Sequence, residues 1–129
     1  MGSGVAGLLR KKYPMIFSPY FSVVNAHIKS GEKEEILGTI NIVPVTNSLR
    51  VANMFTQYNY GYAGQRYTDY DAIKKAFSRL KMVNIKKLPV YIPYQYGCGL
   101  GGGDWKVVQS IIESVYPEVI VCRLEEDKI

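Results

Sequence analysis

Two glycine-rich segments are the residues of this 129-residue chain whose types and spacing could do chemistry. The first covers residues 2–7 and the second covers 97–103, where five of the seven residues are glycine. Glycine permits positive φ and lets the backbone approach a ligand closely. Amides in the first turn of a following helix favour negative charge. Two such loops that face each other would surround a diphosphate from both sides.

Both segments also match G-x-G-x-x-G, the fingerprint of a dinucleotide-binding turn. The second is the better match, because a strand precedes it, a helix follows it, and Glu125 and Glu126 lie where an acid would meet a ribose. Against this interpretation, few residues follow for further strands, and Asp104 places an acid where a pyrophosphate would lie. A P-loop is excluded because neither segment ends in Gly-Lys-Ser/Thr. Ligand-free tight turns are disfavoured because such dense glycine costs folding entropy.

Hydrophobic periodicity predicts alternating helices and strands around these loops. The predicted elements are a helix from the opening glycines to Tyr13, a helix over 19–29, strands over 36–43 and 49–57, a helix capped by Thr68 or Asp69, a strand over 88–94, a helix capped by Asp104, and a strand over 119–124. This order predicts the α/β class, as a three-layer α/β/α sandwich with a mixed central sheet and a hairpin in its middle.

The predicted core lies on one face of each later helix. The third helix should bury Ile73, Ala76, Phe77 and Leu80, which have helical spacing. The fourth helix should bury five residues: Val107, Val108, Ile111, Ile112 and Val115. The apolar run over 119–124 should be a strand covered on both faces.

The first glycine turn begins at residue 2, although such a turn normally follows a strand. We therefore expect a single domain over 1–129 that is amino-terminally short and lacks its first strand. A missing strand would expose a sheet edge, which predicts a homodimer through that edge.

Composition narrows the class of protein. Hydrophobic residues make up 47% and charged residues 21%, typical of a globular domain, and the net charge of +5 favours anionic partners. We expect a cytoplasmic protein with no membrane partner, because no apolar run is long enough to span a bilayer and no signal sequence opens the chain. Cys98, Cys122 and His27 have no metal-binding spacing, so neither a metal nor a cofactor is expected.

The chain resembles the macro domain family. The resemblance rests on Gly2-Ser3-Gly4-Val5-Ala6 with the basic helix after it, on the segment over 93–105 with Gly97-Cys98-Gly99-Leu100 and Asp104-Trp105, and on the strand over 51–57. It is similar to the branch that includes ADP-ribose 1″-phosphate phosphatases, terminal ADP-ribose glycohydrolases and phage or bacterial relatives.

The resemblance implies binding of ADP-ribose or ADP-ribose 1″-phosphate, free or as an ADP-ribosylated protein. It implies a ligand-binding set made of Gly2, Ser3, Gly4, Val5, Ala6, Asn53, Gln57, Tyr58, Gly97, Cys98, Gly99, Leu100, Gly101 and Gly102. If the protein is an enzyme, the expected reaction is hydrolysis of ADP-ribose 1″-phosphate, although no catalytic residue is assigned. A binding-only reader and an NAD-binding domain are the alternatives.

Departures from the family pattern bear on catalysis. The asparagine-bearing segment and the acidic residue that precede the first loop in the family have no counterpart here. Gly101 stands where glycohydrolases carry an aspartate, and no lysine lies between Leu49 and Asp71, so a lysine-based glycohydrolase mechanism is disfavoured.

Two features allow more than one interpretation. Cys98 is either a reactive thiol activated by the helix terminus or a small packing residue. The tyrosine-rich segment over 58–70 is a lid over the ligand, a stacking surface for single-stranded bases, or a loop without a ligand role. A nucleic-acid partner is not expected.

Overall fold

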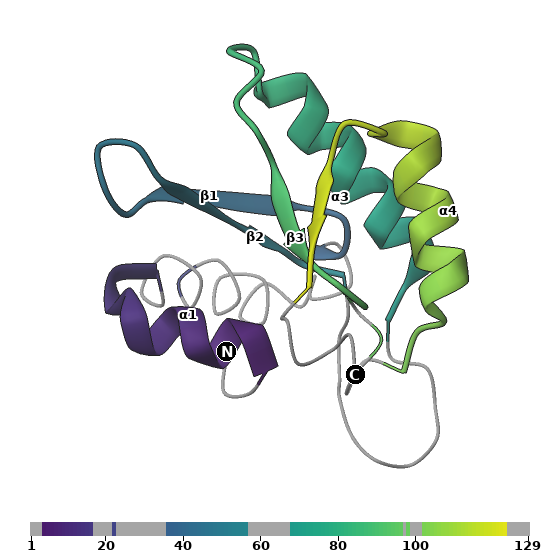
Figure 1. Cartoon of the computed structure of the whole chain (residues 1–129), viewed down its shortest axis with the longest axis horizontal. Helices are drawn as coiled ribbons and strands as arrows, with labels where there is room; N and C mark the ends of the chain where they lie inside the picture. Colours follow the sequence, from purple (N-terminus) through teal and green to yellow (C-terminus); the bar gives the residue numbers. More distant parts are fainter. Residues whose placement is uncertain are drawn as a thin grey trace.

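The computed structural model describes residues 4–16, 22, 36–56, 68–96, 98 and 102–123. Its elements, drawn in Figure 1, are α1 (Gly4–Lys12), the 3-10 turn η1 (Pro14–Ile16), β1 (Ile40–Pro44), β2 (Arg50–Met54), α3 (Tyr70–Val83), β3 (Tyr91–Pro93), α4 (Trp105–Val115) and β4 (Ile120–Cys122). The predicted helix over 19–29 lies outside the described residues except for Ser22, which is helical. The α/β class is confirmed.

The strands pair in two ways. β1 and β2 form the predicted antiparallel hairpin, with Ile40 opposite Met54 and Pro44 opposite Arg50. β3 and β4 are parallel, with Tyr91 opposite Ile120. Both pairing directions of a mixed sheet are therefore present, and within the described residues they form two separate two-stranded sheets.

Helix α3 forms the centre of the core. Asp69 caps it, because its side chain accepts a hydrogen bond from the Ala72 N–H at 3.0 Å, and so satisfies one of the unpaired amides of the first turn. The predicted apolar stripe is confirmed, since all four of its residues are buried: Ile73, Ala76, Phe77 and Leu80. This stripe packs against α4 and β3 in a single apolar cluster.

Helix α4 buries less of its surface than its sequence predicts. Asp104 caps it as expected, and Val108 and Ile112 are fully covered. Val107 is 37% exposed, so its predicted burial is wrong, and Ile111 and Val115 are only half-buried. The helix contacts the core along one stripe, and successive residues at about 100° intervals cannot all share that stripe.

Strand β4 is not covered on both faces, which corrects the prediction for 119–124. Ile120 is 43% exposed and Val121 is 40% exposed. The backbone of Ile120 and Cys122 bonds toward β3, through Ile120 N–H to Val90 O at 2.8 Å and Tyr94 N–H to Cys122 O at 2.7 Å. Because strand residues alternate in direction, the N–H and C=O of Val121 point away from β3, toward a side of β4 on which no strand pairs among the described residues.

Helix α1 ends at Lys12, and Pro14 opens the 3-10 turn that follows it, as its fixed φ predicts. Leu8 on this helix is 68% exposed. Among the described residues no helix has both the length and the apolar character that crossing a membrane requires.

Gly38 is fixed by both its conformation and its surroundings. Its φ is +84°, and a Cβ placed on it would lie 2.8 Å from the Cβ of Lys75 on α3. Gly38→Ala should therefore destabilise the fold by about 1–3 kcal/mol, because the left-handed backbone and the steric contact both disfavour a side chain. Urea unfolding measures this change. Gly103→Ala is the control, since Gly103 lacks a positive φ. Equal midpoints for Gly38→Ala and the unsubstituted protein would contradict the account.

Candidate ligand site at the second glycine loop

The carboxyl ends of β2 and β3 meet the amino end of α3 at Thr56. This residue is buried, and its carbonyl accepts the Asp69 N–H at 2.7 Å, which holds the start of α3 against the end of β2. Its hydroxyl lies 3.3 Å from the hydroxyl of Tyr96, which belongs to the turn that follows β3. Thr56 thus connects two strand ends and a helix, the helix through its backbone carbonyl and the end of β3 through its hydroxyl.

Tyr96 anchors the entry to the second glycine loop. Its ring packs edge-on against Phe77 of α3, with centroids 6.0 Å apart and an angle of 85° between planes. Burial raises the pKa of the Tyr96 hydroxyl, and the hydrogen bond with Thr56 acts in the opposite direction. The hydroxyl is therefore neutral at physiological pH and serves as a fixed hydrogen-bonding group.

A tight turn leads from Tyr94 into the loop. Gln95 has a φ of +60°, and the Cys98 N–H donates to the Gln95 carbonyl at 2.9 Å. The Cys98 thiol donates to the Tyr96 carbonyl at 3.4 Å, so backbone and side chain of Cys98 both point back toward the strand end. These contacts fix the direction in which the loop leaves β3.

The exit of the loop is anchored to α3. Gly102 has a φ of +72°, a conformation that glycine adopts without strain. Two residues later, the Asp104 N–H donates to the Tyr70 hydroxyl at 3.0 Å. Tyr70 is the first residue of α3, so the amino ends of α3 and α4 are joined at the point where the loop ends.

The amino end of α4 is already partly occupied by the protein's own groups. Asp104 Oδ1 accepts the Lys106 N–H at 2.9 Å, and the Asp104 N–H is taken by Tyr70. The expectation that the first-turn amides of this helix point freely at an anion is therefore wrong for these two. An anion at this loop would depend on the glycine backbone between Cys98 and Asp104.

Charge at the loop affects Cys98. Burial raises the pKa of the Cys98 thiol, and the nearby Asp104 carboxylate raises it further. The thiol therefore stays protonated at neutral pH, which argues against a reactive thiolate and favours the packing interpretation.

An aromatic contact supports the loop from its other side. The rings of Tyr94 and Trp105 meet edge to face, with centroids 5.4 Å apart. The guanidinium of Arg123, just after β4, lies 4.2 Å from the centroid of the Tyr94 ring. Trp105 thus packs at the base of the loop, the role expected by default for a half-buried tryptophan.

The structure brings only part of the predicted site into view. Gly4, Val5 and Ala6 form the first turn of α1, and Cys98 and Gly102 lie in the loop just described. The remaining glycine-loop and tyrosine-loop positions lie outside the described residues: Gly2, Ser3, Gln57, Tyr58, Gly97, Gly99, Leu100 and Gly101.

Asn53 is engaged within the β1–β2 hairpin. Its side-chain amide donates to the Asn41 Oδ1 at 3.3 Å, and the two residues are directly opposite in the register. Asn53 also precedes the last residue of β2, whereas Thr56 is the polar residue that reaches the neighbouring strand end.

Sequence reasoning missed three residues that hold the loop: Thr56, Tyr70 and Tyr96. A polar residue after a strand and a tyrosine in the first turn of a helix are weak signals by themselves. The contacts that give them their roles join residues 34 and 40 positions apart.

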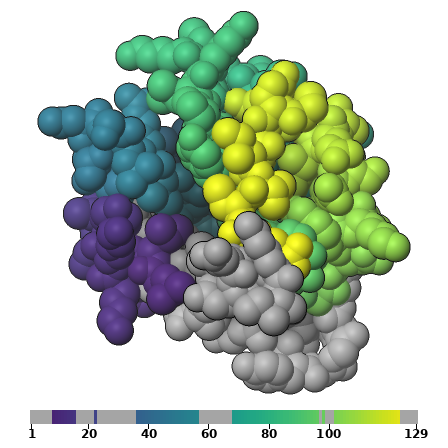
Figure 2. Space-filling model, viewed as in Figure 1, coloured from purple at the N-terminus to yellow at the C-terminus, as the bar shows by residue number. Residues whose placement is uncertain are grey.

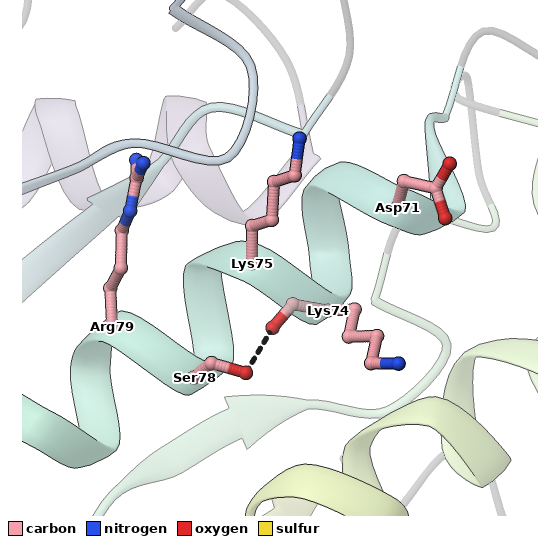
Figure 3. Close-up of a pocket in the computed structure, with 5 residues that line it drawn as sticks. All are labelled: Asp71, Lys74, Lys75, Ser78 and Arg79. Atoms are coloured by element: carbon pink, nitrogen blue, oxygen red, sulfur yellow. Dashed lines mark hydrogen bonds between the residues drawn. The ribbon is translucent and has the colours of Figure 1, made fainter.

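A separate hollow lies on the outer surface of α3 (Figure 3). It is lined by Asp71, Lys74, Lys75, Ser78 and Arg79. Lys75 and Arg79 point to one side of the helix and Lys74 to the other, so the three cations do not converge on one point. The Arg79 Nη1 donates to the Gly38 carbonyl at 2.8 Å, which gives this side chain a structural role.

The interaction between Asp104 and Cys98 predicts a measurable change in thiol reactivity. Asp104→Asn keeps a good capping side chain but removes the negative charge, so the pKa of Cys98 should fall. In a Cys122→Ser background, Cys98 should react faster with iodoacetamide near pH 8 than it does with Asp104 present. The rate as a function of pH measures this directly. An unchanged or upward-shifted profile would show that the carboxylate does not act on the thiol.

The chain is similar to several solved structures. No protein-family model and no curated protein matches the chain. A solved Bacteroides thetaiotaomicron protein of unknown function is 31% identical, with a TM-score of 0.71, over 95% of this chain and 77% of that one. A second structure from the same organism is 32% identical, with a TM-score of 0.74, over 95% and 78%.

A macrodomain protein from Streptomyces coelicolor has the same fold, with a TM-score of 0.70 and 23% identity over 95% of this chain and 77% of that one. The chain therefore has the macrodomain fold and belongs to the same family as the Bacteroides thetaiotaomicron proteins.

Proposed function

We propose that the protein binds ADP-ribose or a close derivative, with the diphosphate held between the first and second glycine loops. The observation that carries the proposal is that the second loop is anchored at both ends. Tyr96 and Gln95 fix its entry, and the bond between Asp104 and Tyr70 fixes its exit. A loop held at both ends can present glycine amides to a diphosphate with little loss of conformational entropy on binding.

The two helices that follow the loops differ in charge. Asp104 caps α4, whereas α1 has no acidic residue in its first turn and carries Arg10, Lys11 and Lys12 in its last turn. The amino end of α1 therefore keeps its positive dipole charge for an anion. In this arrangement α1 supplies the electrostatic attraction, and the second loop supplies the close backbone approach. The complete three-layer sandwich would place both loops at one end of the sheet.

We also consider whether the protein hydrolyses its ligand or only binds it. The similarity to the phosphatase-like branch supports hydrolysis of ADP-ribose 1″-phosphate, with water as the nucleophile and loop amides stabilising the phosphoryl oxygens. The alternative is a reader that binds free or protein-linked ADP-ribose without reaction. Among the described residues, the groups at the second loop are a carboxylate that caps a helix, a protonated thiol and buried hydroxyls, and none is positioned as a general base by a visible partner. This favours the reader.

Calorimetric titration tests the proposal. ADP-ribose should bind saturably, and NAD and AMP should bind more weakly, because neither presents the free distal ribose beside the diphosphate. Gly102→Val should weaken ADP-ribose binding about tenfold or more, since a branched side chain is strained at positive φ. No binding of ADP-ribose would refute the proposal. Release of inorganic phosphate from ADP-ribose 1″-phosphate would assign the enzyme, and binding without release would assign the reader.

The edge of β4 that faces away from β3, on which no described strand pairs, supports the expected homodimer. Val121 directs its N–H and C=O away from β3, and its side chain is 40% exposed. A second copy could pair antiparallel with this edge about a two-fold axis. Light scattering should then give a dimer mass, and Val121→Pro, which removes the central N–H, should shift it toward the monomer. A monomer mass for the unsubstituted protein would contradict this assembly.

A further inference from the structure

The last turn of α3 and the turn that leads from it to β3 carry the most exposed large hydrophobic side chains of the described residues. We call residues 82–88 the apolar tip. Ile85 is 85% exposed and Met82 is 79% exposed, with Val83 and Leu88 also exposed. Figure 1 shows the tip projecting at the top of the molecule, and Figure 2 shows it as a protrusion rather than a hollow.

The apolar tip is held in a fixed conformation by Asn84. The Asn84 side chain donates to the Leu88 carbonyl at 2.8 Å and accepts the Leu88 N–H at 3.0 Å. It also donates to the hydroxyl of Tyr116, a buried residue at the end of α4, at 2.9 Å. The exposed side chains of the tip are thus presented by a clamped turn that is connected to the core.

The charged residues of the apolar tip are all positive. Lys86 and Lys87 are exposed within it, and no acidic residue occurs between Met82 and Tyr91. Outside the tip, Glu118 pairs with Lys81 of α3 at 3.9 Å. Rigidly exposed apolar groups beside lysines that pair with no carboxylate among the described residues indicate a partner that is both apolar and negatively charged.

Three kinds of partner for the apolar tip can be compared. A second copy of the tip would place Lys86 and Lys87 against their own copies, which like-charge repulsion opposes. A protein groove would need a rigid acidic rim shaped to a convex turn. An anionic lipid surface offers negative head groups above an apolar layer, and it adapts to a convex shape because it is fluid.

We propose that the apolar tip docks on an anionic lipid surface, with Ile85 and Met82 entering the interface and Lys86 and Lys87 contacting the head groups. The proposal departs from the sequence-based expectation of no membrane partner, which rested on the lack of a bilayer-spanning apolar run, because a docked tip lies on a membrane and crosses nothing. Two apolar side chains and two lysines give weak, reversible binding that depends on salt.

The proposal fits the position of the second glycine loop. The apolar tip follows the carboxyl end of α3 and precedes β3, whereas the glycine loop follows the carboxyl end of β3 and contacts the amino end of α3. The two features are therefore at opposite ends of the same helix and strand. A protein docked through the tip would keep the loop facing away from the lipid.

Sedimentation with vesicles tests the proposal on the full chain. The probes are vesicles of phosphatidylcholine alone and vesicles in which about a third of the lipid is phosphatidylserine. The protein should sediment with the second kind, and the bound fraction should fall as salt is raised. Ile85→Ser should lower the partition coefficient about tenfold, and Lys86→Gln with Lys87→Gln should lower it by a similar factor.

The matched control is Leu8→Ser, which removes a 68% exposed leucine from α1 and should leave vesicle binding unchanged. All the substituted side chains are exposed, and circular dichroism melting confirms that each variant is folded. No sedimentation with phosphatidylserine vesicles, equal sedimentation with both kinds, or an equal loss in Leu8→Ser and Ile85→Ser would each overturn the proposal. These outcomes are independent of ADP-ribose binding, which the Ile85 variant should retain.

Discussion

The pairing of two helix starts is the constraint on which the candidate site depends. Tyr70 opens α3 and accepts the N–H of Asp104, which caps α4, so the amino ends of the two helices cannot move apart without breaking this bond. Thr56 adds the end of β2 and the Tyr96 hydroxyl to the same junction. The apolar cluster beneath, centred on Phe77, fixes the helices that carry these groups. The second glycine loop is therefore a glycine-rich sequence between fixed anchors, which is the arrangement that a preorganised ligand loop needs.

Asp104 has a structural benefit and an electrostatic cost at this junction. Its side chain satisfies an amide of α4 and so stabilises the helix, and its backbone N–H completes the contact with α3. Its carboxylate also places negative charge beside Cys98 and beside the space in which a diphosphate would lie. The first turn of α1 has no acidic residue. In the proposed binding mode, the first loop would therefore attract the anion and the second loop would position it.

Features with local causes could be predicted from the sequence, and features that depend on distant partners could not. The stripe Ile73–Phe77–Leu80 and the capping roles of Asp69 and Asp104 follow from spacing and side-chain chemistry within one helix, and the structure confirms them. The exposure of β4 was not predictable, because an apolar run has the same sequence pattern whether one face of the strand is covered or both are. Likewise, nothing in the sequence around Thr56 or Tyr96 indicates that they meet. The glycine loops could be recognised by composition, but the bonds that occupy the amides of Asp104 and Lys106 appear only in three dimensions.

The central claim is that a diphosphate lies against the anchored second loop and the amino end of α1. An amide NMR titration of the protein with ADP-ribose tests it most directly. The account predicts that the largest shifts occur at Gly102, Gly103 and the first turn of α1, and that the amide of Ile85 at the far end of α3 does not shift. Saturable shifts that avoid both glycine segments and instead fall on Lys74, Lys75 and Arg79 would contradict it, since they would place the ligand in the hollow on α3.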